Sequence, residues 1–264
     1  MPITEALLCI FNTSHGTGRI GQGTLTNWVT GLELWYSINC VPWLGKGHLN
    51  HAIKGATSVT PSSSSCPLHL LVLISHLQSL HATLDLKNTF DASVYAIACI
   101  SFWSQCRLIE LCLDELFDPL HHPSRGSHWK EGTASNGLNY GAFFTPHTKT
   151  KPRGVWNYWT CSGYICSADK AFNTHIGINS NILPKAPLFA FKTSPMSWEP
   201  MHWSWFMEHR NEIWLASGHT SLMDYSFRIR GTMHLLLLGV DLFIVMVQGH
   251  WNSDAFLAYW HHCE

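Results

Sequence analysis

The sequence predicts a mainly helical protein that contains one small antiparallel β-sheet. Apolar residues recur at intervals of three and four in Leu71–Leu84 and Ala92–Leu113, as they do along one face of an α-helix. Aromatic and β-branched residues are instead concentrated in Tyr140–Thr145 and Val155–Thr160. These two segments lie on either side of the turn-forming sequence Lys151-Pro-Arg-Gly154, which predicts a β-hairpin.

The part of the chain before the first of these helices divides into two predicted regions. Residues 1–23 contain four glycines and no sustained apolar period, and we expect them to be poorly ordered. Residues 24–65 are predicted to form a small helical domain and a linker, with one helix before Pro42 and a shorter helix after it. The linker is the serine- and proline-rich run Thr60–Pro67, and residues 66–264 follow as the main domain.

The end of the main domain is predicted to be helical, over Met201–Ser217 and again from about Ser226 onward. Its most hydrophobic run, Leu235–Val247, has 13 residues and contains Asp241, so it is too short to span a bilayer. We expect a buried helical hairpin there, and no membrane partner. The N-terminus also lacks a signal-peptide pattern.

The composition indicates a globular protein but does not indicate its partner. Apolar residues make up 46% of the chain, with 13 Trp and 13 Phe, which is enough for a substantial core. Charged residues make up only 12%, and the net charge is −1. DNA-binding proteins usually carry a basic surface, and this composition does not reveal one.

The cysteines and histidines predict neither a disulfide framework nor a metal site. The nine cysteines include no Cys-x-x-Cys pair, so we expect a reducing compartment. His121-His122 and His261-His262-Cys263 contain metal-ligating residue types, but neither group has a second ligand pair at structural-zinc spacing. No metal and no cofactor are expected.

Five residues of the main domain form a candidate catalytic set, namely Arg107, Lys149, Arg228, His250 and Tyr259. Each one alone has an ordinary alternative. Arg107 can form a helix salt bridge with Glu110, three residues later. The lysine can lie in a solvated turn, the second arginine on a helix surface, and the histidine can cap a helix. The tyrosine, which lies among Phe256, Leu257 and Trp260, can simply pack in a core.

Together, these residue types suit the cleavage of a phosphodiester by a tyrosine. Two guanidinium groups can hold the non-bridging phosphate oxygens with paired hydrogen bonds, a geometry that lysine cannot supply. The positive charge then stabilises the transition state. A mobile lysine can protonate the departing 5′ oxygen, and nearby positive charge favours the ionised form of the attacking phenol.

The order Arg–Lys–Arg–His–Tyr and the gap of 259 − 250 = 9 residues between His250 and Tyr259 resemble the active site of the tyrosine recombinases. The chain is similar to the integrase-like members of this family in fungal mobile elements and, more distantly, to phage and bacterial site-specific recombinases. The likeness runs from about Thr24 to Glu264. It is strongest in four segments: Leu84–Glu110, Ala186–Phe191, Asn211–Trp214 and Ser226–Trp260.

The resemblance implies an integrase-like catalytic domain preceded by a short helical segment, part of the domain that clamps the opposite face of the DNA. It also implies a role for each residue of the set. Arg107 and Arg228 would hold the phosphate, Glu110 would support Arg107, Lys149 would be the general acid, His250 would lie beside the phosphate, and Tyr259 would be the nucleophile. Further DNA contacts are expected from Lys151, Arg153 and Arg230.

The implied activity is site-specific DNA recombination or integration through a 3′-phosphotyrosine intermediate, which needs neither ATP nor a metal. The implied partners are double-stranded DNA and further copies of the chain, since relatives assemble as a tetramer on DNA. The implied location is the nucleus.

Some residues depart from the family pattern and favour an alternative. Tyr225, a sixth candidate catalytic residue, stands where the family has the histidine of His-x-x-Arg. A tyrosine there can still donate a hydrogen bond, but it is a far weaker base near neutral pH. Asp224 and Arg230 replace glycines of the usual pattern. The chain also stops five residues after Tyr259, where relatives often carry a tail that packs against a neighbouring protomer. The alternative is therefore a catalytically impaired DNA-binding relic of a mobile-element recombinase.

Overall fold

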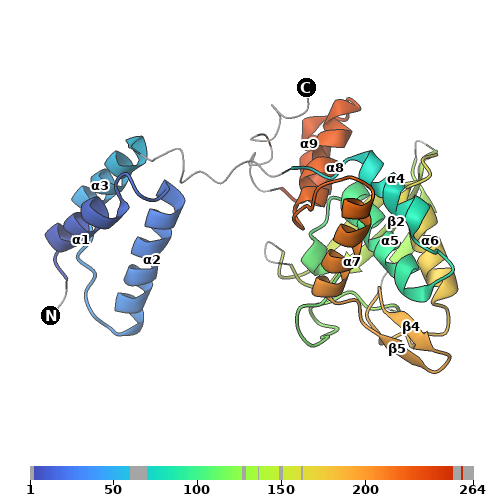
Figure 1. Ribbon diagram of the computed structural model, residues 1–264. Helices are drawn as coiled ribbons and strands as arrows, with labels where there is room; N and C mark the ends of the chain where they lie inside the picture. The colour runs from blue at the N-terminus through green and yellow to red at the C-terminus, as the bar shows by residue number, and fades with distance from the viewer. Residues whose placement is uncertain are drawn as a thin grey trace. The chain divides into compact units, whose positions relative to one another are not determined.

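The computed structural model describes residues 3–59, 70–126, 129–135, 137–148, 151–161, 163–251 and 257 (Figure 1). The chain divides into two compact units, Met1–Leu68 and His69–Glu264. This division falls just after the predicted linker, Thr60–Pro67, and three residues after the expected boundary at residue 65. Lys149 and Tyr259 of the predicted site lie outside the described residues.

The first unit is helical. Its elements are α1 (Glu5–Phe11), a π-helix η1 (Asn12–Gly16), α2 (Gln22–Ile38) and α3 (Gly47–Ser58). The core of this unit is small and is formed by Leu8, Val29 and Leu49, one residue from each α-helix. The two helices expected on either side of Pro42 are present as α2 and α3. However, Trp28 and Trp35 of α2 are largely exposed.

Regular structure occupies a region that was expected to be poorly ordered, residues 1–23. Thr4 caps α1 by accepting a hydrogen bond from the Leu7 N–H (3.4 Å). The Glu5 carboxylate accepts hydrogen bonds from the N–H groups of Lys46 (2.8 Å) and Leu49 (3.2 Å) at the start of α3. These bonds reach more than 40 residues along the chain, so no local sequence period could have predicted them.

The second unit contains the remaining helices and the strands of the described residues (Figure 1). Its helices are α4 (Ile74–Thr83), α5 (Thr89–Trp103), the 3-10 turn η3 (Leu108–Glu110), α6 (Ala168–Ile178), α7 (Trp203–Ala216), α8 (Ser226–Leu237) and α9 (Leu242–Gln248). Every side chain from Ala92 to Trp103 is buried, so α5 is the central helix of the core. The mainly helical fold with a small antiparallel sheet is confirmed.

The predicted β-hairpin is present. Strands β2 (Asn139–Thr145) and β3 (Val155–Thr160) pair antiparallel, with Thr145 opposite Val155, and β1 (Trp129–Thr133) pairs with the other edge of β2. The sequence did not predict β1, α6, or the two-stranded ribbon of β4 (Phe191–Ser194) and β5 (Ser197–Glu199).

Helix α5 ends ten residues earlier than the apolar spacing of Ala92–Leu113 predicted. Its last residue is Trp103, and Gln105 has a φ of +57°, which a right-handed helix cannot contain. Arg107 therefore lies in a loop after the helix, and the expectation that it lies late in a helix is wrong.

The predicted helical hairpin around Leu235–Val247 is formed by α8 and α9, which are joined at Gly239 (φ +81°). It is not buried as expected. Phe243, Ile244 and Val247 are 73%, 56% and 58% exposed, and only Val245 of α9 is buried. Among the described residues, no helix has the length and apolar character needed to cross a membrane.

Candidate active site

Arg107 lies in the loop that follows α5 and has an extended backbone (φ −78°, ψ 140°). Its Nη1 donates to Glu110 Oε1 (2.9 Å), and its backbone N–H donates to Glu110 Oε2 (3.2 Å). The Glu110 side chain is 7% exposed, whereas the Arg107 side chain is 30% exposed. The buried carboxylate thus fixes the guanidinium group while part of that group still faces solvent.

Arg228 lies in the first turn of α8 and is 7% exposed. Its Nη2 donates to the carbonyl oxygen of Gly249 (2.7 Å), and its Cζ lies 4.1 Å from the ring centre of Trp251. Burial and, to a smaller extent, the nearby charge of Arg107 lower the pKa of Arg228 to about 10, against the opposing effect of Glu110. The two predicted arginines therefore lie close enough to interact, and Arg228 stays charged at neutral pH.

His250 follows α9 and has a left-handed backbone (φ +53°). Burial and the charge of Arg228 lower its pKa, with smaller contributions from Lys151 and Arg107, while a hydrogen bond with the Trp156 backbone opposes them. Its Nε2 is buried and has no hydrogen-bond partner among the described residues. The imidazole is therefore neutral at neutral pH, and one of its nitrogens remains available to a ligand.

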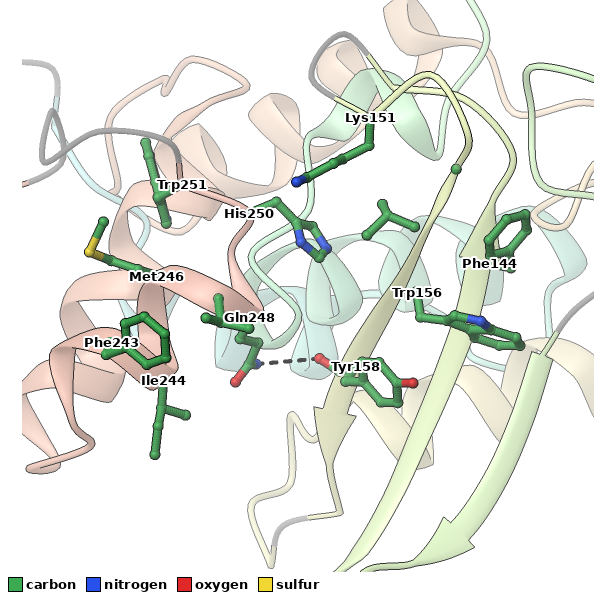
Figure 2. A pocket seen from close by; sticks show the side chains of 13 residues that line it. Phe144, Lys151, Trp156, Tyr158, Phe243, Ile244, Met246, Gln248, His250 and Trp251 are labelled. Carbon is green, nitrogen blue, oxygen red and sulfur yellow. Dashed lines mark hydrogen bonds between the residues drawn. The ribbon is translucent and has the colours of Figure 1, made fainter.

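Lys151 brings an ammonium group to the same place. The backbone N–H groups of Lys151 and Thr148 each donate to the other residue's carbonyl oxygen (both 3.2 Å), which closes the turn between β2 and β3. Figure 2 shows the Lys151 side chain extending from this turn toward His250. Arg153 lies in the same turn and is exposed. Of the lysines in this turn, the structure describes only Lys151.

A buried hydrogen-bond network positions Trp251 against Arg228. The Thr232 hydroxyl donates to Gln105 Oε1 (2.7 Å) and accepts from Trp251 Nε1 (3.0 Å), so Trp251 is held over the Arg228 guanidinium. Gly249 leaves the space for this network, because a Cβ at that position would lie 2.5 Å from Gln105 Oε1. Gln105, Thr232 and the role of Trp251 were not predicted from the sequence. The only available signal was the position of Trp251 directly after His250.

Tyr225 lies at the N-terminus of α8, three residues before Arg228, and its N–H donates to Asp224 Oδ1 (2.8 Å). Its side chain packs against an apolar cluster that includes Ile229 and Met233. Leu257, two residues before Tyr259, packs against the same cluster.

Arg230 is partly buried, and its charge lowers the pKa of His234 on the same helix, an effect secondary to the burial of His234.

The arrangement is suited to holding an anion. Four separate segments supply its polar groups, which are those of Arg107, Lys151, Arg228 and His250. These groups lie close enough to change the pKa values of Arg228 and His250. Glu110 partly offsets the lowering of the Arg228 pKa, whereas Arg228, Lys151 and Arg107 all lower the pKa of His250. Paired guanidinium groups match the geometry of phosphate oxygens. The described residues contain no group of three or more His, Cys, Asp or Glu that could hold a metal ion.

Comparison with solved structures relates this arrangement to a known fold. The chain is similar to the XerH site-specific recombinase bound to a palindromic difH substrate, with 14% identity and a TM-score of 0.62, over 98% of this chain and 69% of XerH. The chain has a tyrosine recombinase-like fold.

Two other recombinase structures are also similar. The Flpe–Holliday junction complex has 13% identity and a TM-score of 0.47, over 88% of this chain and 53% of Flpe. XerA recombinase has 12% identity and a TM-score of 0.40, over 82% of this chain and 74% of XerA. The chain therefore spans about half the length of Flpe. No protein-family model and no curated protein matches the sequence.

Proposed function

We propose that this protein cleaves and rejoins double-stranded DNA through a 3′-phosphotyrosine intermediate formed by Tyr259. The main support is the convergence of Arg107 and Arg228, 121 residues apart in the sequence, beside His250 and Lys151 on a recombinase-like fold. Site-specific recombination or integration of a mobile element, in the nucleus, is the biological role that we infer from this chemistry.

In the proposed reaction, Arg107 and Arg228 hold the two non-bridging oxygens of the scissile phosphate, and His250 lies beside the same group. The Tyr259 hydroxyl oxygen attacks phosphorus, and the bond from phosphorus to the 5′ oxygen breaks. A lysine of the β2–β3 turn gives its proton to that oxygen, and the tyrosine proton passes to solvent. Rejoining reverses these steps, so the phosphotyrosine conserves the energy of the bond.

We further infer that the protein acts on DNA as an assembly of several copies. XerH was solved on a palindromic substrate. Two identical half-sites are read most simply by two copies related by a two-fold axis. Lys151, Arg153 and Arg230, the further candidates for DNA contact, supply positive charge on the turn and on α8.

Covalent capture tests the proposed chemistry. The protein is incubated with a pool of nicked duplexes of randomised sequence, denatured in detergent, and assayed for DNA that migrates with the protein. We expect an adduct with the native protein and none with Tyr259→Phe, which lacks only the attacking oxygen. Absence of an adduct with the native protein would contradict the proposal.

The second candidate is a catalytically impaired protein that binds DNA through the arginine pair. The position of Tyr225 favours it, because this residue replaces the family's histidine and packs against an apolar cluster. Salt-sensitive DNA binding without a Tyr259-dependent adduct would support this candidate and exclude cleavage.

A further inference from the structure

A large cavity opens beside the candidate active site, between the β2–β3 hairpin and α9. Its volume is about 920 Å³, within the range of roughly 300–1,000 Å³ that is typical of sites for small organic ligands. Figure 2 shows Phe144, Trp156 and Tyr158 on the side of the sheet, and Phe243 and Trp251 on the side of α9. Aromatic rings therefore line both walls.

The charges around this cavity are positive. Lys151 lines it beside the neutral ring of His250, and no Asp or Glu is among its described lining residues. Lys130 lies on β1, the strand that pairs with β2. Its ammonium group is 4.1 Å from the ring centre of Trp156 and 5.5 Å from that of Tyr158, both on β3. The cavity thus combines aromatic surface with cations, the combination that binds unpaired nucleotides by stacking and charge attraction.

The cavity also adjoins Arg228 of the arginine pair. Trp251 lines the cavity and lies over the guanidinium of Arg228, and His250 lines the cavity while its pKa responds to both arginines. A ligand in the cavity would therefore lie next to a phosphate held by Arg107 and Arg228. A nucleotide next to that phosphate can place its base in the cavity, because the base and the phosphate are covalently linked in one strand.

We propose that this cavity binds an unstacked nucleobase of the strand whose phosphate the arginines hold. The inference rests on the proposed function, since a cleaved strand must unpair from its complement before it joins a new partner. The bases that lose their neighbours then need another surface on which to stack, and the rings of Tyr158 and Phe243 supply one.

The test compares two DNAs that share one nicked duplex sequence, one of which carries a three-nucleotide single-stranded flap at the nick. Affinities are measured by fluorescence anisotropy at one fixed salt concentration. Phe243→Ala removes an aromatic ring from the wall of the cavity, and the Phe243 side chain is 73% exposed. Leu242→Ala is the matched control, because Leu242 is 43% exposed on the same helix but does not line the cavity.

We expect the native protein and Leu242→Ala to prefer the flap, and Phe243→Ala to lose about tenfold in affinity for the flap DNA alone. Tyr158→Ala should behave in the same way, and a 5-iododeoxyuridine in the flap should crosslink to the cavity aromatics. Arg228→Ala should weaken the binding of both DNAs because it removes a phosphate contact.

The outcomes separate the two proposals. If Phe243→Ala binds both DNAs like the native protein while Arg228→Ala weakens both, the nucleobase site is wrong and the proposed function stands. If Arg228→Ala weakens neither, the proposed function is wrong. If Phe243→Ala changes only the mass of the protein in light scattering, the cavity receives a second protein copy and the nucleobase site is overturned.

Discussion

Arg228 stays charged although it is buried. The residues that surround it include some that no sequence motif predicts. The sequence order predicted Arg107, Arg228 and His250 as site residues, because their types and spacing suit the proposed chemistry, and the structure places them near one another. The sequence order could not identify Gln105 and Thr232, since their side chains meet across 127 residues. Such a contact depends on how α8 packs against the end of α5.

In the proposed reaction, the proton donor is one of the two lysines of the β2–β3 turn. Lys149, which was predicted from the family order, lies outside the described residues, and Lys151 extends toward His250. We therefore expect Lys151→Ala to slow cleavage of ordinary DNA by at least about 100-fold, as the loss of a general acid does. A substrate with sulfur at the bridging 5′ position should restore its rate, because a thiolate leaves without a proton.

Lys149→Ala is the matched control for this experiment, since it removes the same charge from the same turn. Its rate on ordinary DNA should fall less, and sulfur should not restore the difference. Selective restoration of Lys149→Ala instead would assign the proton to Lys149 and leave Lys151 as a phosphate contact.

Helix α8, which carries Arg228, packs closely against α5 at Gly231. A Cβ at Gly231 would lie 1.9 Å from the Phe102 carbonyl oxygen, a backbone atom that cannot move aside alone. We expect Gly231→Ala to destabilise the protein by about 1–3 kcal/mol, the usual cost of overpacking, and to weaken DNA binding because Arg228 lies less than one turn away.

Urea unfolding and DNA titration measure these two effects. Gly177→Ala, in α6, is the control, because a Cβ there meets nothing within 4 Å and alanine favours a helix. Equal unfolding midpoints for the two variants would show that α8 does not depend on this contact.

Elements of the fold were predictable where the local pattern sets them. The β2–β3 hairpin followed from aromatic and β-branched segments around a turn, and α7 followed from helical spacing over Met201–Ser217. The end of α5 did not, because Cys106 and Ile109 continue the apolar period beyond Trp103. The helix stops where Gln105 turns to bond with Thr232, which is a tertiary interaction. Strands β4 and β5 have only four and three residues, too few to show a period.

At the scale of the whole molecule, buried histidines link stability to pH. Burial lowers the pKa of His76 to about 4 and that of His175 to about 3. His76 Nδ1 accepts from the Leu73 N–H at the start of α4, and His175 bonds with Ser93 of α5 and the Leu188 carbonyl. Both rings therefore support the core as neutral groups.

Because their pKa values are lower in the folded state than in the unfolded chain, both histidines favour folding above about pH 6.5. Below that pH only the unfolded chain binds these protons, so stability falls with falling pH until about pH 4 for His76 and about pH 3 for His175. Near pH 5 two such groups give the free energy of unfolding a slope of up to about 2.7 kcal/mol per pH unit.

Urea midpoints at pH 7.5, 6.5 and 5.5 measure this pH dependence, and His76→Gln should reduce the slope by about half. A constant midpoint across this range would show that these rings take up protons without unfolding.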